Sequence, residues 1–317
     1  MLRPAISVVI PTFNRAMLAL QAVQSVFAQT FSDYEVIVVD DGSTDNTKDV
    51  LAAFTSAPNF SYQHQPNSGR SSARNHGIKL ARGEFMMFLD SDDMLFPDAL
   101  ANLYQAARQT TSGLILGQAQ FIDEYEMKLS LLEPTAKARR GGMTYPFLIS
   151  ERYVLLQGAF VVRAACLHKI GGFDRALEPC EDYDFCLRAA LECRMTYVET
   201  PVLKCRVHGG NTDMTEIYEA GLKVARRHLR LLAEAESIPA SLRRAGRANW
   251  MLRVAHNNYN LLRNREAFKH YLRALVLQPA LVLDLSIDRQ ILASLLPVLL
   301  RERLKPSRHS SKRVANL

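Results

Sequence analysis

The 317-residue sequence predicts an α/β fold with a mostly parallel central sheet, followed by an all-helical extension. Short apolar runs alternate with stretches of helical periodicity up to residue 199, which is typical of a parallel sheet flanked by helices. From Thr215 onward only helical periodicity remains. We therefore expect an α/β domain over residues 1–214, a helical extension over 215–300 and a basic, disordered tail over 301–317.

The predicted elements follow one another along the α/β domain. Strands are predicted over residues 6–10, 34–39, 60–63, 85–89, 113–121, 158–162 and 195–199. Helices are predicted over 18–27, 44–54, 97–109, 164–170 and 185–192, and a further helix opens after the polar turn at Asn67 and continues to Ala81. Residues 128–142 are polar and basic and contain Pro134 and two glycines, so we expect a mobile loop there.

The helical extension contains one short pattern of its own. Aromatic and small residues from Trp250 to Pro279 have the spacing of one degenerate tetratricopeptide-like helix pair. Because a single repeat cannot bury its own apolar face, we expect this pair to pack on the α/β domain or on a partner.

The chain has the composition of an ordinary globular protein, with 48% hydrophobic and 22% charged residues and a net charge of +7. The tail after Leu300 carries six Lys and Arg residues against Glu302 alone, so it could meet an anionic membrane surface or nucleic acid, or simply be solvated. The apolar run 291–300 is too short to span a bilayer and is either an interfacial helix or a helix packed on the core. A peripheral membrane contact is thus left open, and we expect no nucleic-acid partner.

The cysteines point to a reducing compartment. They are odd in number and contain no C-x-x-C pair, which favours reduced thiols over disulfides or a zinc site: Cys166, Cys180, Cys186, Cys193 and Cys205. The N-terminus runs directly into a strand pattern without the layout of a signal peptide. We therefore expect a cytoplasmic protein.

Three carboxylates directly follow the apolar run 85–89, namely Asp90, Asp92 and Asp93. If the run is a buried strand, they lie at its carboxyl end, where open α/β sheets bind ligands. Crowded carboxylates repel one another unless a cation joins them, and Mg²⁺ or Mn²⁺ prefers such oxygen ligands together with substrate phosphates. The alternative is a strand end followed by a helix that Asp92 or Asp93 caps.

Other phosphate-binding signals are mixed. No G-x-G-x-x-G or G-x-x-x-x-G-K-[ST] motif follows a strand, which disfavours a dinucleotide site or an ATPase loop. Arg70 and Arg74 lie one turn apart at a predicted helix start, an arrangement that suits a phosphate group. The alternative is that both are ordinary surface arginines.

Five motifs taken together resemble those of family 2 glycosyltransferases with the GT-A fold. They occur in order at residues 7–15, 38–45, 67–75, 89–93 and 181–184, so the resemblance covers about two thirds of the chain. It implies an inverting enzyme that moves a sugar from a nucleotide-sugar donor, expected to be UDP-linked, to a hydroxyl group. The acceptor would be a cell-surface glycan or a lipid-linked saccharide.

The same resemblance implies a set of nucleotide-sugar-binding residues, namely Pro11, Thr12, Phe13, Arg15, Asp40, Asp41, Arg70, Arg74, Asp90 and Ser91. Pro11, Phe13 and Arg15 would lie near the base and ribose. Asp41, or else Asp40, would accept from the uracil N3–H, and the other role open to Asp40 is a turn cap. Arg70 and Arg74 would contact the base or the diphosphate, and Asp90 the ribose.

The resemblance also implies a divalent metal ion, Mn²⁺ or Mg²⁺, bound by Asp92 and His208. Such an ion stabilises the charge that grows on the diphosphate leaving group. His208 could instead contact the diphosphate or be structural. Asp182 would be the base that removes the acceptor proton, with Glu181 and Asp184 as competitors and a simple N-terminal helix charge as its alternative role.

Two other functional classes compete with the transferase. A non-catalytic nucleotide-sugar-binding or scaffold protein would not need a base, so the joint presence of Asp92 and Asp182 argues against it. A nucleotidyltransferase usually has a glycine-rich, lysine-bearing phosphate loop after the first strand, where this chain has residues 11–14.

Overall fold

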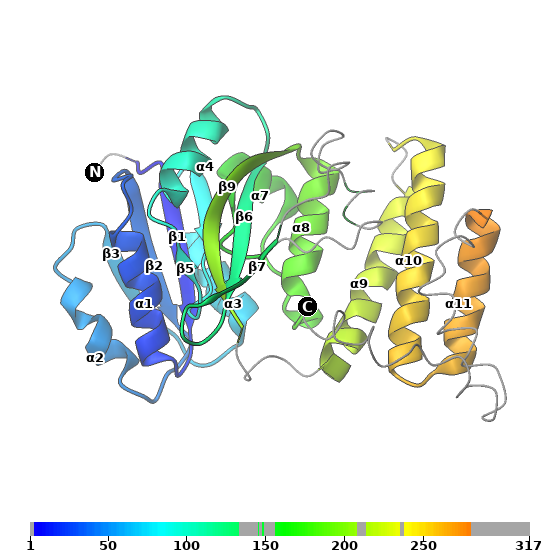
Figure 1. The fold of residues 1–317 in the computed structure, drawn as a ribbon, viewed down its shortest axis with the longest axis horizontal. Coiled ribbons are helices and arrows are strands. Elements are labelled where there is room, and N and C mark those ends of the chain that lie inside the picture. Colours follow the sequence, from blue (N-terminus) through cyan, green and yellow to red (C-terminus); the bar gives the residue numbers. More distant parts are fainter. Residues whose placement is uncertain are drawn as a thin grey trace. The chain divides into compact units, whose positions relative to one another are not determined.

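The chain consists of two compact units, Met1–Asn211 and Thr212–Leu317. The structure is a computed structural model that describes residues 3–132, 145, 148, 156–207, 214–234 and 238–279. Figure 1 shows a sheet with flanking helices in the first unit and long helices in the second.

The sheet of the first unit has the order β3-β2-β1-β4-β8-β6-β9-β5, with β7 paired to β6. The strands are β1 (Ile6–Thr12), β2 (Tyr34–Asp40), β3 (Phe60–His64), β4 (Phe85–Phe88), β5 (Met94–Leu95), β6 (Leu114–Ile122), β7 (Lys128–Leu132), β8 (Phe160–Arg163) and β9 (Met195–Arg206). Strands β3, β2, β1 and β4 are parallel, whereas β8 runs antiparallel to both β4 and β6. The predicted α/β class is confirmed, with a sheet that is parallel in one half and mixed in the other.

The helices of this unit connect the strands. They are α1 (Ala16–Phe27), α2 (Thr47–Leu51), α3 (Arg70–Leu80), α4 (Ala99–Arg108), α7 (Ala164–Ile170) and α8 (Glu181–Glu192). Every residue of β1, β2 and β4 is buried, which explains why these strands read as continuous apolar runs in the sequence. The parallel half therefore forms a buried layer beneath the strand ends.

Helix α3 approaches β1 closely at Gly77. A Cβ atom placed there would lie 2.2 Å from Cγ1 of Val9, a residue without solvent exposure. We expect Gly77→Ala to lower the free energy of unfolding by about 1–3 kcal/mol, because extra volume in a packed core forces neighbouring atoms to shift. Urea denaturation measures this loss. Adding Val9→Ala should recover part of it if the clash is the cause, and a double variant no more stable than Gly77→Ala would contradict the explanation.

The second unit contains α9 (Met214–Glu234), α10 (Ala240–Asn260) and α11 (Asn264–Leu277). The predicted helix pair is present as α10 and α11, which share a small apolar core of Leu252, Ala255, Tyr271 and Ala274. Helix α9 packs on α10, where the buried rings of His228 and Trp250 stack 5.5 Å apart. The tetratricopeptide-like character of the pair stays a prediction.

Several predicted boundaries need correction. The helix predicted over 44–54 is the shorter α2 followed by a 3-10 turn, Ala52–Phe54. The loop predicted over 128–142 begins as strand β7, because Asp123 accepts hydrogen bonds from the backbone N–H groups of Tyr125 and Met127 and so closes a hairpin with β6. The rest of that loop, the 291–300 run and the basic tail lie outside the described residues. No helix within the described ranges is long and apolar enough to span a bilayer.

The expectation that all cysteines are reduced is wrong for one pair. Cys166 in α7 and Cys193 just after α8 form a disulfide, with their Cα atoms 6.2 Å apart. The two helices pack together and bring into bridging range two residues that are 27 positions apart in the sequence. Cys180, Cys186 and Cys205 take no part in a disulfide. The cytoplasmic location, so far as it rested on reduced cysteines, loses that support.

Candidate active site

The predicted site residues of the described part of the chain come together at one edge of the sheet. They lie at or just after the carboxyl ends of β1, β2 and β4, in the first two turns of α3, or in the first turn of α8. In parallel sheets these ends meet at a common edge, where ligands bind.

The turns after β1 and β2 are joined by Asn14. Its backbone N–H donates to Ser43 Oγ (2.9 Å), and its side-chain Oδ1 accepts from the backbone N–H of Thr44 (2.7 Å). Asn14 has φ +51°, a left-handed conformation that asparagine tolerates better than most residues. Pro11 and Thr12 are buried at the end of β1, while the next residue, Phe13, is 44% exposed and accessible to a ligand.

The two aspartates after β2 are held by protein donors. Asp40 accepts from the backbone N–H of Ser43 (2.8 Å), which is the turn-cap role, and from the hydroxyl of Tyr62. Asp41 accepts from Gln65 Nε2 (2.7 Å) and from the backbone N–H groups of Ser68 (2.9 Å) and Gly69 (2.8 Å). Both carboxylates therefore order the loops that frame the edge. Sequence reasoning missed Gln65, which carries no motif signal.

The carboxylates after β4 have different environments. Asp92 Oδ2 lies 2.5 Å from Arg15 Nη1, and the two side chains are 17% and 38% exposed. Asp93 is buried and accepts from the backbone N–H of Arg206 (2.9 Å). Burial raises the pKa of Asp93, and the charges of Asp92 and Asp90 raise it further. Neither Asp92 nor Asp93 caps the next helix, whose N-cap is Asp98; the capping alternative is wrong.

Arg206 at the end of β9 fixes the turn that carries these carboxylates. Its Nε donates to the backbone carbonyl of Asp92 (3.2 Å), and its two terminal nitrogens donate to the carbonyl of Glu124 (3.2 Å) and to Gln21 Oε1 (3.1 Å). The side chain is only 5% exposed. The sequence shows the arginine but not these partners, because they come from three distant segments.

Arg74 is not a surface residue. Its side chain is 3% exposed and bridges Asp90 Oδ1 and Glu181 Oε1, each at 2.7 Å. Its guanidinium also lies over the ring of Phe173, 5.2 Å from the centroid. Arg70 is 48% exposed and only 3.9 Å from Glu181. The buried arginine thus ties α3, the end of β4 and the start of α8 into one unit.

A further residue that sequence reasoning missed, Glu178, lies between the same helices. One of its carboxylate oxygens accepts from the backbone N–H of Ser71 at 2.8 Å, in the first turn of α3. A Cβ atom on Gly69 would lie 2.9 Å from the other oxygen, so the glycine is needed for this close approach. This contact fixes the segment before α8 against the start of α3.

The three acidic residues at the start of α8 are distinguished by their partners. Glu181 is buried against Arg74, and Asp184 is buried and paired with Arg188 (2.7 Å). Asp182 is half-buried, and its Oδ1 accepts from the backbone N–H of Tyr183 (2.6 Å). Burial raises the pKa of Asp182 to about 7, with a further contribution from the charge of Glu181 and an opposing one from Arg74. Asp182 is thus suited to take up a proton near neutral pH.

The donor set suits a hard divalent cation. Asp90 and Asp92 supply carboxylate oxygens at one strand end, and their side chains are 36% and 17% exposed. The described residues contain no group of three or more His, Cys, Asp or Glu side chains that could by themselves bind a metal ion. Mg²⁺ and Mn²⁺ sites often use one or two carboxylates and complete their shell with substrate phosphates. His208, the other predicted ligand, lies outside the described residues.

The chain is similar to known glycosyltransferases. Residues 7–155 match glycosyl transferase family 2. The poly(ribitol-phosphate) β-N-acetylglucosaminyltransferase TarP of Staphylococcus aureus is 40% identical over 118 residues, 36% of this chain and 36% of that protein. The chain covers 34% of the length of each of the first two curated relatives it matches.

Two solved structures share the fold. Residues 1–349 of S. aureus TarS in complex with UDP-GlcNAc match with a TM-score of 0.66 and 23% identity, over 86% of this chain and 79% of that one. The mannosyltransferase PcManGT of Pyrobaculum calidifontis, in complex with GDP-Man and Mn²⁺, matches with a TM-score of 0.53 and 17% identity, over 96% and 89%.

Proposed function

We propose that the first unit, which is a family 2 glycosyltransferase domain with the GT-A fold, transfers a sugar from a nucleotide donor to an acceptor hydroxyl with inversion. The observation that carries the proposal is the convergence of Asp90, Asp92, Arg74 and Asp182 at one sheet edge. The UDP-GlcNAc bound to TarS supports a UDP-linked donor.

Asp182 is the proposed base. With a pKa of about 7 its carboxylate is partly deprotonated at neutral pH and still basic enough to accept the proton of an attacking hydroxyl. Glu181 and Asp184 are less suited to the role, because each is bound by a buried arginine. Arg74 and Glu181 position the first turn of α8 that carries the base.

A divalent cation bound by Asp92 would stabilise the negative charge that develops on the leaving diphosphate. Mn²⁺ in the PcManGT complex supports such an ion, and His208 stays a proposed second ligand. Because Arg15 pairs with Asp92 at 2.5 Å, its guanidinium balances that carboxylate when no other cation does. Pro11, Thr12, Phe13, Asp40, Asp41, Arg70, Asp90 and Ser91 are the proposed contacts of the nucleotide and the donor sugar.

The acceptor is proposed to be a hydroxyl of a cell-envelope polymer or of a lipid-linked saccharide. The relative TarP is named for a poly(ribitol-phosphate) acceptor, which supports a polymer of polyol phosphates as one member of this class. A polymer of this kind carries both the hydroxyl groups that the reaction consumes and one negative charge for each phosphodiester.

Asp92→Asn tests the metal-dependent part of the proposal. We expect Mn²⁺ to strengthen UDP binding to the unaltered protein and this gain to be lost in the variant, because the amide keeps the shape but lacks the charge. A loss of tenfold or more in affinity, about 1.4 kcal/mol, is readily measured by isothermal titration calorimetry.

Asp98→Asn is the matched control, because Asp98 is an exposed aspartate at the start of α4 and should leave the affinity unchanged. A panel of UDP-, GDP- and dTDP-sugars with and without Mn²⁺ then identifies the donor. If UDP binds equally well with and without metal and Asp92→Asn is fully active, the metal-assisted mechanism is wrong. Donor binding without any sugar transfer or hydrolysis would favour the scaffold alternative.

A further inference from the structure

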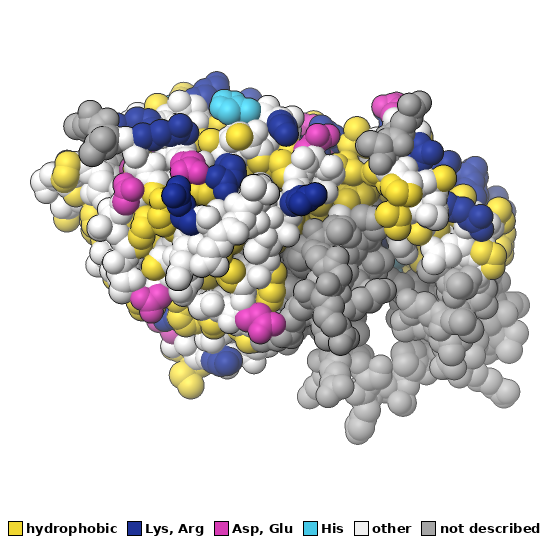
Figure 2. All heavy atoms as spheres, turned by 90° about the horizontal axis from the view of Figure 1, so that it is seen from above, with side chains coloured by type: hydrophobic (Ala, Val, Ile, Leu, Met, Phe, Trp, Pro, Cys, Tyr) yellow, Lys and Arg dark blue, Asp and Glu magenta, His cyan; other side chains and the backbone are white. Residues whose placement is uncertain are grey.

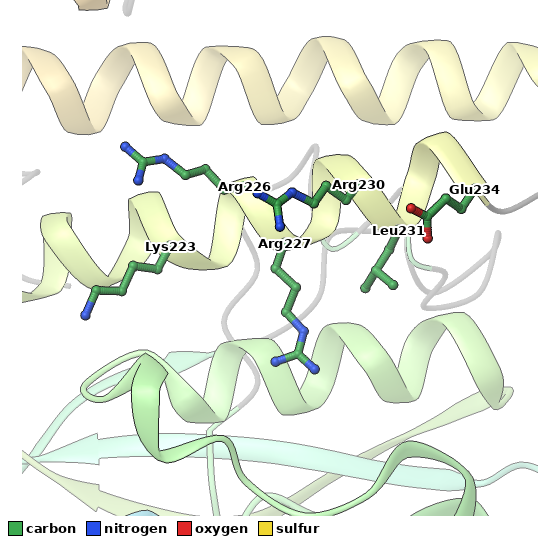
Figure 3. A pocket seen from close by; sticks show the side chains of 6 residues that line it. All are labelled: Lys223, Arg226, Arg227, Arg230, Leu231 and Glu234. Carbon is green, nitrogen blue, oxygen red and sulfur yellow. The ribbon is translucent and has the colours of Figure 1, made fainter.

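A row of cations lies along one face of α9 in the helical unit. The proposed transfer reaction assigns no role to these side chains. Together with two other residues of the same helix they line a hollow, shown in Figure 3: Lys223, Arg226, Arg227, Arg230, Leu231 and Glu234. The cations recur at intervals of three and four residues, so they follow one another along the same side of the helix. Four of these six lining residues are cations and one, Glu234, is a carboxylate.

The opposite side of α9 already holds the helix in place. Its apolar side chains are buried, and Ala225 and His228 have no solvent exposure. A carboxylate outside this row, Glu219, is bound by Arg263 of α11 at 2.5 Å. Arg226 and Arg230 are both exposed and lie four residues apart, a spacing at which like charges repel by about 0.2–0.5 kcal/mol. A bound anion would relieve that repulsion.

The dimensions of the row indicate the kind of anion. From Lys223 to Arg230 the helix rises about 10 Å, at about 1.5 Å per residue, so the row is longer than one phosphate group. Three of the four cations are arginines, whose planar guanidinium groups bind phosphate oxygens in pairs. In Figure 3 the side chains of Arg226 and Arg230 both extend toward the Lys223 end of the helix. Such a row matches an extended chain with repeated phosphates.

The charge of the segment that spans the three helices favours the same ligand. Residues 214–279 contain twelve Lys and Arg residues against five Glu and no Asp, a surplus as large as the net charge of the entire chain. On the face drawn in Figure 2, the Lys and Arg side chains of the helical unit cover more surface than its acidic ones. A surplus of this size attracts polyanions over distances of about 10 Å at 0.1 M salt.

We propose that the α9 face formed by Lys223, Arg226, Arg227 and Arg230 binds the phosphodiester groups of a polymeric acceptor. The inference deepens the proposed function, since it assigns the acceptor to the class of polyol-phosphate polymers and gives the helical unit a role in holding it. It also explains why the second unit is basic.

The test is binding of a fluorescein-labelled polyol-phosphate oligomer to the full chain, followed by fluorescence anisotropy between 50 and 300 mM NaCl, a range of roughly sixfold around physiological ionic strength. The variant is Arg226→Glu with Arg230→Glu. Its matched control is Arg265→Glu with Lys269→Glu, which reverses two exposed cations of α11 at the same four-residue spacing. Circular dichroism confirms that both variants keep their helices.

We expect the α9 variant to bind the oligomer at least tenfold more weakly and to show a salt slope that is shallower by roughly one to two, since each lost phosphate contact removes about one released counterion. The α11 control should keep most of the affinity. Equal losses in the two variants would overturn the proposal, because they would show attraction by net charge alone. Stronger binding to phosphatidylglycerol vesicles or to a single-stranded oligonucleotide than to the oligomer would overturn it too.

Donor binding and donor hydrolysis are measured on the same preparations, without oligomer. If the unaltered protein binds the oligomer through α9 but shows no reaction with any nucleotide sugar, the proposed transferase function fails while the α9 site stands. If both variants hydrolyse the donor normally and neither loses oligomer binding, the α9 site fails while the transferase function stands.

Discussion

Replacing Asp182 by Asn is expected to lower turnover by roughly 10²–10⁴-fold, the range that general-base catalysis contributes, while donor binding is unchanged. The amide has nearly the size of the carboxylate, and its Oδ1 can still accept from the backbone N–H of Tyr183. What it lacks is a basic oxygen that can accept the acceptor proton. Initial rates at saturating donor measure the loss, and calorimetric titration of the nucleotide checks that binding persists.

The pH dependence of the unaltered protein shows which protonation state of Asp182 is active. Burial and the charge of Glu181 raise the pKa of Asp182 to about 7, so the carboxylate is protonated below that pH and cannot act as a base. Catalytic efficiency should therefore rise with pH and level off above about 7. In Asp182→Asn this rise of catalytic efficiency with pH, the pH limb, should disappear.

Asp184→Asn serves as the control for these measurements, because Asp184 is buried against Arg188 and its loss should reduce stability without removing the pH limb. Wild-type turnover by Asp182→Asn at pH 8 would rule out Asp182 as the base, and Glu181 would then be the next candidate.

Most of the strands could be predicted because the parallel half of the sheet is covered on both faces. Strands such as β1 and β4 are buried along their whole length and give continuous apolar runs. Strand β5 has two residues and leaves no pattern. Strand β9 continues to Arg206, beyond the predicted end at Glu199, and it contains Pro201, a residue that is unusual in a strand interior. The structure accommodates Pro201 where the register between β6 and β9 shifts beside Gln118.

The candidate site was predictable in its residue types but not in its pairings. The sequence places acidic residues at strand ends and arginines at a helix start, and these are local signals. It does not show that Asp41 is held by Gln65 and the start of α3, or that Arg74 is buried between Asp90 and Glu181. Such contacts, like the disulfide of Cys166 and Cys193, join segments far apart in the chain and exist only after folding.

Arg74→Met is expected to lower the free energy of unfolding by about 3–5 kcal/mol, because it leaves Glu181 buried without its cation. Glu181 is 1% exposed, so water cannot replace the lost partner, whereas the side chain of Asp90 is 36% exposed and can be solvated. Methionine retains most of the apolar stem of arginine, which separates the charge effect from loss of packing. The unfolding transition of the first unit in guanidinium chloride measures the change.

Two comparisons show whether the lost charge is the cause. Arg70→Met removes an arginine that is 48% exposed and 3.9 Å from the same Glu181, so its effect should stay within about 0.5 kcal/mol. In the double variant Arg74→Met with Glu181→Gln the buried carboxylate is neutral, and the combined loss should be smaller than the sum of the single losses. Strict additivity would mean that Arg74 stabilises the fold through its packing on Phe173 instead.

Arg74 should also influence catalysis through the base. Its positive charge lowers the pKa of Asp182, in opposition to burial and to Glu181, so the pH limb of Arg74→Met should move to higher pH in the fraction of protein that remains folded. A residue with a purely structural role would reduce the amount of active enzyme without moving that limb. The shift therefore separates positioning of the proposed base from support of the fold. It follows from one buried guanidinium that joins Asp90 to the helix that carries Asp182.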